Sequence, residues 1–187
     1  MSALSSHSMH WPWVRRLRIG EAELYRQVRL AALRESPAAF STTYESARQR
    51  SLESWREQAD STAQGRDRAT FIAFCGEAPI GLAALYRTAA DPNVGELLQV
   101  WVSPPHRGRG VALALTDALL QWARASGFRT ALAAVAQGNS RALRLYRRCG
   151  FTSASAPSPG APVILAKDVE DAPPEGDSGC RRCRSMG

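Results

Sequence analysis

Segment 100–112 carries the clearest chemical pattern of the chain, Val-Trp-Val-Ser-Pro-Pro-His-Arg-Gly-Arg-Gly-Val-Ala. An apolar strand that enters a glycine-rich turn ahead of a helix leaves backbone N–H groups free to bind a phosphate. Gly108 and Gly110 allow a close approach because they lack a Cβ, and the side chains of Arg107 and Arg109 can pair with phosphate oxygens. The pattern predicts a phosphate site, although a plain strand–helix turn with solvent-facing arginines fits the same residues.

A second pattern lies at 139–151, Asn-Ser-Arg-Ala-Leu-Arg-Leu-Tyr-Arg-Arg-Cys-Gly-Phe. Asn139 precedes the apolar-periodic part and is suited to cap a helix, because its side chain can accept a hydrogen bond from a first-turn N–H group. Tyr146 and Leu143 are three positions apart and share one face of that helix. By spacing alone, Tyr146 is better explained as a core residue than as a catalytic one.

Taken together, the two segments resemble the GNAT superfamily of acetyl-CoA-dependent N-acetyltransferases. Segment 107–112 matches the acyl-CoA pattern of that family: Arg or Gln, two residues, Gly, one residue, then Gly or Ala. Segment 139–151 has the Asn, Ala, Tyr and Gly-Phe of its second hallmark at the family spacing. The approach at 101–104, Trp-Val-Ser-Pro, resembles the end of the family's fourth strand. The resemblance extends over about residues 13–168, with its specific motifs in 94–151.

The resemblance implies acetyl-CoA as cosubstrate and no metal. Backbone N–H groups of 108–112 suit the pyrophosphate of CoA, since the positive end of the following helix attracts anions. The pantetheine arm has amides and can lie beside the strand at Val100 and Val102 like an added strand. The implied cosubstrate-binding residues are Val100, Trp101, Val102, Arg107, Gly108, Arg109, Gly110, Val111, Ala112, Asn139, Ala142 and Tyr146.

The implied reaction is attack of an amine on the thioester, with Tyr146 as the general acid that protonates the leaving thiolate. A phenol with a pKa of about 10 can supply that proton at short range. Glu96 is the best candidate for a general base acting through water, because bases of this family often lie on the central strand. An exposed carboxylate near a strand start explains Glu96 equally well. Alternation along the strand predicts that Glu96 shares a face with Leu98, Val100 and Val102.

The acceptor is expected to be a small-molecule amine or a protein N-terminus. Acceptor specificity in this family comes from the first helical region and the last strands, here about 33–55 and 152–164. Phe40 and Tyr44 either line an acceptor pocket or pack on the sheet, and His106 is interpreted as a surface residue. The alternative function is a non-catalytic acyl-CoA-binding regulatory module, which would have no use for the phenol of Tyr146.

These motifs need a set of alternating elements to position them. Apolar periodicity and turn residues predict strands over 13–19, 70–75, 80–86, 94–102, 130–136 and 162–166, and helices over 20–36, 45–59, 111–126 and 139–150. The order predicts an α/β (α+β) fold with one mixed, mostly antiparallel sheet flanked by helices. We expect an N-terminal extension at 1–12, one GNAT-type domain at 13–168 and a disordered C-terminal tail at 169–187.

Composition describes an ordinary single-domain chain of 187 residues with 44% hydrophobic residues. The net charge is +7, but the arginines are spread along the chain, which favours a solvated surface over a nucleic-acid-binding face. No apolar run approaches the ~20 residues of a membrane span and no signal peptide is expected, so we predict a cytoplasmic monomer or homodimer with no nucleic-acid or membrane partner. The Cys180 and Cys183 pair lacks further metal ligands and is interpreted as part of the tail.

Overall fold

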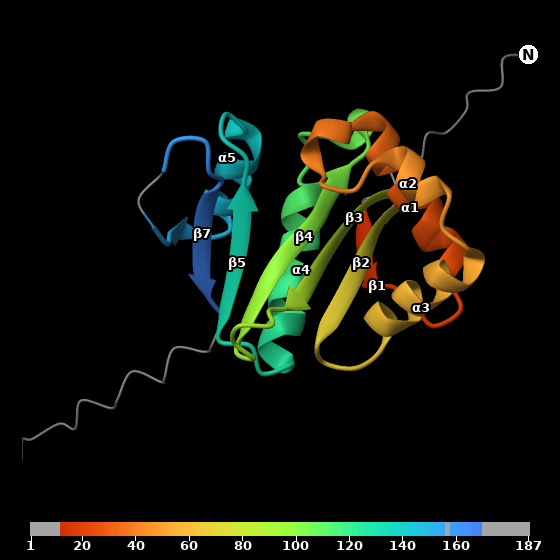
Figure 1. Ribbon diagram of the computed structural model, residues 1–187, viewed down its shortest axis with the longest axis horizontal. Coiled ribbons are helices and arrows are strands. Elements are labelled where there is room, and N and C mark those ends of the chain that lie inside the picture. Colours follow the sequence, from red (N-terminus) through yellow and green to blue (C-terminus); the bar gives the residue numbers. More distant parts are fainter. Residues whose placement is uncertain (1–11, 156–157, 170–187) are drawn as a thin grey trace, which may run out of the picture.

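A computed structural model describes residues 12–155 and 158–169. Its centre is one sheet of seven strands in the order β1-β2-β3-β4-β5-β7-β6 (Figure 1). Neighbouring strands are antiparallel except β4 and β5, which are parallel. This arrangement confirms the predicted fold class. The strands are β1 Trp13–Arg16, β2 Arg68–Cys75, β3 Ala78–Arg87, β4 Val94–Val102, β5 Thr130–Val135, β6 Thr152–Ser153 and β7 Val163–Asp168.

Helices cover both faces of the sheet. On one face, α1 and α3 bury Tyr25 and Trp55 against Leu82 of β3. On the other face, α4 buries Leu115 and Leu119 in the second core cluster. Figure 1 shows α1, α2 and α3 grouped over the β1–β3 part of the sheet and α5 near the end of β5. The helices are α1 Ala22–Glu35, α2 Tyr44–Arg48, α3 Leu52–Ala63, α4 Val111–Ala125 and α5 Ser140–Arg148, with 3₁₀ turns η1 Pro37–Ala39 and η2 Pro104–His106.

The single helix expected over 45–59 is wrong, because the chain forms α2 and α3 there. Ser51 has an extended backbone, and its side chain accepts a hydrogen bond from the N–H group of Ser54 at 3.2 Å. This is the geometry of an N-cap, so a new helix begins at Leu52. The residue types carried the signal, since serine is among the preferred N-cap residues.

Strand β4 contains a bulge that changes which way its side chains point. Leu82 of β3 pairs with Trp101, whereas Ala84 pairs with Leu98, so two residues of β4 oppose one residue of β3. Gln99 has a φ of 59°, which is uncommon for a residue other than glycine. An extra residue of this kind re-aims the side chains that follow it.

The bulge makes the predicted common face of Glu96, Val100 and Val102 wrong. Val102 and Leu97, the neighbour of Glu96, belong to the core cluster on the α4 side, and Val100 packs against that cluster. Because side chains alternate along a strand, Glu96 faces the other way, toward the α1 side. The inserted residue at Gln99 moves the later valines to the opposite face.

Strands β4 and β5 separate before either of them ends. Their pairing runs from Val94 with Thr130 to Leu97 with Ala133, and β4 continues for five residues beyond it. Figure 1 shows the two strands diverging toward α5. The edge of β4 that faces the gap is free to accept an extended segment through backbone hydrogen bonds.

Several predictions concern residues that lie outside the described ranges. These residues are 1–11 of the predicted extension at 1–12, and 170–187 of the predicted tail at 169–187, which include the Cys180 and Cys183 pair. The domain boundaries at 12 and 169 therefore stay predictions. Within residues 12–155 and 158–169, no helix is long and apolar enough to cross a membrane.

Candidate active site

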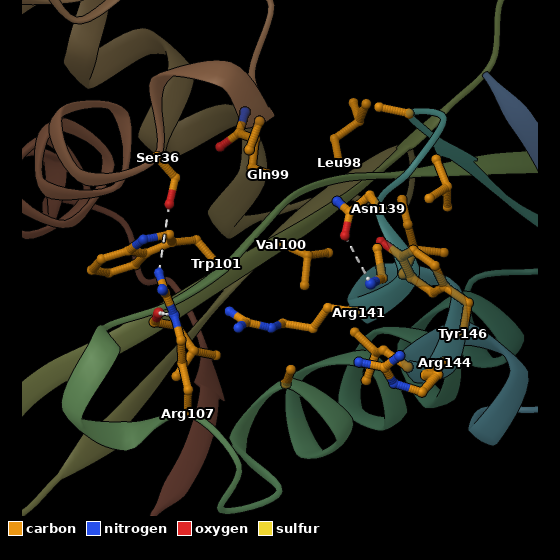
Figure 2. A pocket seen from close by; sticks show the side chains of 18 of the residues that line it. Ser36, Leu98, Gln99, Val100, Trp101, Arg107, Asn139, Arg141, Arg144 and Tyr146 are labelled. Carbon is orange, nitrogen blue, oxygen red and sulfur yellow. Dashed lines mark hydrogen bonds between the residues drawn. The ribbon is translucent and has the colours of Figure 1, made fainter. Parts of the chain in front are cut away.

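A cleft of about 1120 Å³ opens where β4 and β5 separate. Its wall comes from β4, the end of β5, the turn at 106–112 and α5, with η1 and one residue of α1 on another side (Figure 2). Most of the predicted site residues meet here, but Arg109 and Tyr44 are not part of the wall. The predicted residues in the wall are Phe40, Glu96, Val100, Trp101, Val102, Arg107, Gly108, Gly110, Val111, Ala112, Asn139, Ala142 and Tyr146.

The turn before α4 has the geometry of an anion site. Gly108 and Gly110 have φ values of 75° and 80°, a region that residues with a Cβ rarely adopt. A Cβ built on either glycine meets no atom within 4 Å, so the space beside the turn is open. The first α4 hydrogen bond runs from the Ala114 N–H group to the Gly110 carbonyl at 2.9 Å. The earlier N–H groups of α4 have no helical acceptor and can bind a phosphate.

The second motif places a cap and a buried phenol at the opposite side of the cleft. Asn139 Oδ1 accepts a hydrogen bond from the Ala142 N–H group at 3.0 Å, which confirms the predicted N-cap. Tyr146 is 7% exposed, and its ring packs edge-on against Phe151 with centroids 5.4 Å apart. Burial raises the pKa of the Tyr146 phenol, so the hydroxyl keeps its proton at neutral pH. Figure 2 shows the ring directed toward Asn139 and the cleft.

Comparison with known proteins assigns these features to a family. Residues 30–151 match the family model described as the acetyltransferase (GNAT) family. The chain belongs to the GNAT acetyltransferase family. The chain is also 27% identical over 176 residues to the mycothiol acetyltransferase of Cellulomonas flavigena, covering 85% of this chain and 49% of that protein. The chain thus spans about half the length of the curated relatives it matches.

Solved structures of GNAT acetyltransferases share the fold. A GNAT-family acetyltransferase from Streptococcus pneumoniae superposes with a TM-score of 0.69 at 17% identity, covering 84% of this chain and 98% of that one. The PaiA N-acetyltransferase of Thermoplasma acidophilum, solved in complex with coenzyme A, gives a TM-score of 0.67 at 22% identity with the same coverage. At these identities the likeness shows the fold.

Family membership confirms the predictions of an acyl-CoA-dependent acetyltransferase and of acetyl-CoA as its cosubstrate. The residues of the GNAT cleft fit that molecule. The open space beside the turn at 108–110 suits the pyrophosphate, and the unpaired edge of β4 beyond Leu97 suits the amides of the pantetheine arm.

Arg107, predicted as a phosphate ligand of the GNAT motif, is held by protein groups. Its Nε–H donates to the Val102 carbonyl at 2.8 Å, and its Nη2 forms an ion pair with the Glu35 carboxylate. The Trp101 Nε1–H group donates to the same carboxylate at 3.0 Å. Hydrogen bonds from Ser36, Trp101 and Arg107 lower the pKa of Glu35 to about 2. Arg107 thus joins the turn at 107–110, which we call the phosphate turn, to β4 and to the end of α1. Figure 2 shows its hydrogen bond to Ser36, the residue that follows Glu35.

Helix α5 adds three arginines that the sequence reasoning missed. Arg141, Arg144 and Arg148 all line the cleft, and Figure 2 shows Arg141 reaching into it from α5. Within the described part of the chain, none of the three forms an ion pair. Their spacing of three and four residues puts them on one helix face. That spacing is the sequence pattern from which this group of arginines could have been predicted. This cationic face suits the phosphates of CoA.

The α1 side of the GNAT cleft holds the groups that can meet an acceptor. Glu96 is half-buried there and lies opposite Tyr86 in the register of β3 and β4. Gln99 Oε1 accepts a hydrogen bond from the Tyr25 hydroxyl at 3.0 Å. Phe40 lines the cleft. Tyr44 lies outside the wall, where the Arg34 guanidinium covers its ring at 4.7 Å.

His106, predicted as a surface residue, lies in the cleft wall. Its Nδ1 is 2.9 Å from the Ser103 hydroxyl oxygen. This contact closes the 3₁₀ turn η2 that leads from β4 into the phosphate turn. His106 thus has a local structural partner at the edge of the site.

Proposed function

We propose that this chain transfers the acetyl group of acetyl-CoA directly to a primary amine, with Tyr146 as the general acid. The observation that carries the proposal is the buried phenol of Tyr146 in the wall of the cleft that also contains the phosphate turn. A module that only bound acyl-CoA would have no use for a proton donor at that position.

The neutral amine nitrogen attacks the thioester carbonyl carbon, the C–N bond forms and the C–S bond breaks. Tyr146 donates its hydroxyl proton to the departing thiolate, and solvent returns a proton to the phenolate. The proton lost by the amine nitrogen passes to a base or to water.

Glu96 is the proposed acceptor of that amine proton. It lies in the cleft wall on the α1 side of β4, and a half-buried carboxylate can take a proton through one water molecule. Gln99 is a neighbouring polar group on the same side, and it is held by Tyr25. Glu96 is therefore proposed to keep the incoming amine neutral, whereas Tyr146 acts on the leaving group.

The acceptor is proposed to be a small amine or a protein N-terminus. The relative from Cellulomonas flavigena is named mycothiol acetyltransferase, but the present chain covers only about half of that protein. A direct experiment measures free CoA thiol and acetylated product with the full chain, acetyl-CoA and a panel of amines, polyamines, amino acids and short peptides. N-acetylated forms of the same compounds are the controls.

Equal amounts of CoA and acetylated amine are the expected result. If acetyl-CoA binds in equilibrium dialysis but no amine of the panel is turned over, the chain is an acyl-CoA-binding module and the proposal is wrong. Acetylated product without a requirement for a free amine also contradicts it.

A further inference from the structure

Arg29 of α1 is a buried cation at the α1 side of the cleft. It is only 7% exposed and lines the cleft. The ring of Phe40 covers one face of its guanidinium, with the Arg29 Cζ atom 4.3 Å from the ring centroid. Within residues 12–155 and 158–169, Arg29 Nη1 is buried and has no hydrogen-bond partner, and no ion pair involves Arg29. The side chain is thus placed without a counter-ion.

The contact with Phe40 leaves the donors of Arg29 unused. A ring stacked on a guanidinium interacts with its flat face, whereas the five N–H donors lie in the plane of the group. A charge taken out of water is costly unless it is paired and hydrogen-bonded. An in-plane anion is the partner that this site lacks.

The ionisable neighbours of Arg29 do not supply that anion. The groups whose charges act on Arg29 are the phenols of Tyr25 and Tyr86 and the guanidinium of Arg50. Glu96 lies on the same side of the cleft, and among the described residues it forms no ion pair with Arg29. Arg50 uses its own donors on Ser54 and Gln58. Burial lowers the pKa of Arg29, yet an arginine stays protonated in proteins. Arg107, which also lines the cleft, differs because Glu35 pairs with it.

We propose that Arg29 binds a carboxylate of the acceptor, so that the acceptor is a free amino acid or a close analogue. This inference rests on the proposed acetyl transfer. A guanidinium binds a carboxylate through two parallel N–H···O bonds. The two ends of an amino acid then meet complementary groups on the α1 side, because its carboxylate faces Arg29 and its amine faces Glu96.

A requirement for a carboxylate distinguishes small amines from protein N-termini. A protein N-terminus has an amide where a free amino acid has a carboxylate, so it cannot form the ion pair with Arg29. Polyamines would add positive charge beside an unpaired cation, which is unfavourable. Free amino acids are therefore expected to exceed peptides and polyamines as substrates.

Matched substrates test this directly. The twenty L-amino acids are assayed by CoA thiol release beside their primary amides and their decarboxylated amines, for example L-phenylalanine, L-phenylalaninamide and phenethylamine. We expect kcat/KM to be about 100-fold or more higher for the amino acid than for the amide, since a site with buried donors rejects an analogue that leaves them unpaired. O-phosphoethanolamine tests a phosphate in place of the carboxylate.

Variants assign the preference to Arg29. Arg29→Gln is expected to reduce the preference for the amino acid over the amide to a few-fold, by raising KM for the amino acid while KM for acetyl-CoA stays unchanged. Arg29→Lys keeps the charge but lacks the fork, so it retains part of the preference. Arg56→Gln is the matched control, because Arg56 lies on α3, is exposed and pairs only with Glu53 among the described residues.

Thermal unfolding separates a binding role from a structural one. A buried charge without a counter-ion does not stabilise the fold, so Arg29→Met is expected to unfold at the same temperature as the wild type or at a higher one. A midpoint several degrees lower in Arg29→Met, together with an unchanged preference for the amino acid over the amide in Arg29→Gln, would show a structural arginine and overturn the inference.

Equal turnover of amino acids, amides and decarboxylated amines overturns the inference and leaves the acetyl-transfer proposal standing. A higher kcat/KM for O-phosphoethanolamine than for every amino acid overturns the carboxylate assignment. Binding of acetyl-CoA with no turnover in any arm overturns the proposed function and the inference together.

Discussion

The carboxylate of Glu35 and the guanidinium of Arg107 form an ion pair between positions 72 residues apart in the chain. Glu35 is the last residue of α1, and Arg107 opens the phosphate turn. Trp101 of β4 donates to the same carboxylate. The three groups fasten the turn to the α1 side of the cleft, so the phosphate end and the acceptor end of the site share one support.

Removing the Glu35 charge is expected to loosen the phosphate turn. Glu35→Gln keeps the shape of the side chain but removes the ion pair with Arg107, so KM for acetyl-CoA should rise about tenfold with a smaller change in kcat. Steady-state kinetics with varied acetyl-CoA check this. Glu53→Gln is a control, because Glu53 forms an exposed pair with Arg56 on α3. Equal KM values in wild type and Glu35→Gln would contradict the proposed support.

The same carboxylate predicts a pH dependence of stability. Its hydrogen bonds lower the pKa of Glu35 from 4.5 to about 2, so the folded state favours the charged form. The stabilisation is therefore complete above the unfolded-state pKa and is lost as the pH falls from there toward about 2. The thermal midpoint of the wild type minus that of Glu35→Gln should be constant near neutral pH and shrink in this acid range. A difference in midpoint that stays constant down to a pH of about 2 would show that the Glu35 carboxylate does not make stability depend on pH.

Gly110 gives a test of the phosphate turn itself. Its φ of 80° and its place as N-cap of α4 make Gly110→Asn a mild change, because asparagine tolerates this conformation and caps helices. Gly110→Asp has nearly the same shape and adds a negative charge beside the expected pyrophosphate. We expect Asp to weaken CoA binding by at least about tenfold relative to Asn, measured by calorimetry with CoA. Equal affinities of the two variants would place the phosphates elsewhere.

Local patterns in the sequence were sufficient for much of the site. The Gly110 turn, the Asn139 cap and the helices that follow them depend on neighbouring residues, and all are present as predicted. The predicted face of Val100 was wrong, because the direction of that side chain depends on the bulge at Gln99. Glutamine carries no preference for a positive φ, so nothing in the residue types marked that position.

Long-range contacts account for the rest. Arg29 could not be distinguished from the other arginines in the sequence, because its burial comes from the packing of α1 over the sheet and from Phe40. The pairing of Glu35 with Arg107 likewise depends on the fold. The common helix face of Arg141 and Arg144 was predictable from their spacing. That this face lines the cleft was not predictable, because the cleft forms only where β4 and β5 separate.

The arginine face of α5 predicts a salt-dependent contribution to CoA binding. Arg141→Gln and Arg144→Gln each remove one cleft-lining charge, and each should weaken CoA binding about three- to tenfold at low salt and less at high salt. Arg147→Gln is the control, since Arg147 is exposed on α5 but does not line the cleft. Titration calorimetry at two salt concentrations measures the effect. An equal loss of CoA affinity in Arg147→Gln would show that net charge alone, and not the position of Arg141 and Arg144 in the cleft, accounts for the effect.

Tyr146→Phe is the sharpest test of the proposed chemistry, because it removes one oxygen and leaves the ring that packs on Phe151. We expect kcat to fall by about 10²-fold or more, within the range for a lost general acid, with KM for acetyl-CoA and the thermal midpoint unchanged. Burial raises the pKa of this phenol above its usual value, so the wild type should not lose kcat through deprotonation of Tyr146 in mildly alkaline buffer. An unchanged kcat in the variant would exclude Tyr146 as the acid, and the leaving thiolate would then have to take its proton from another group in the cleft.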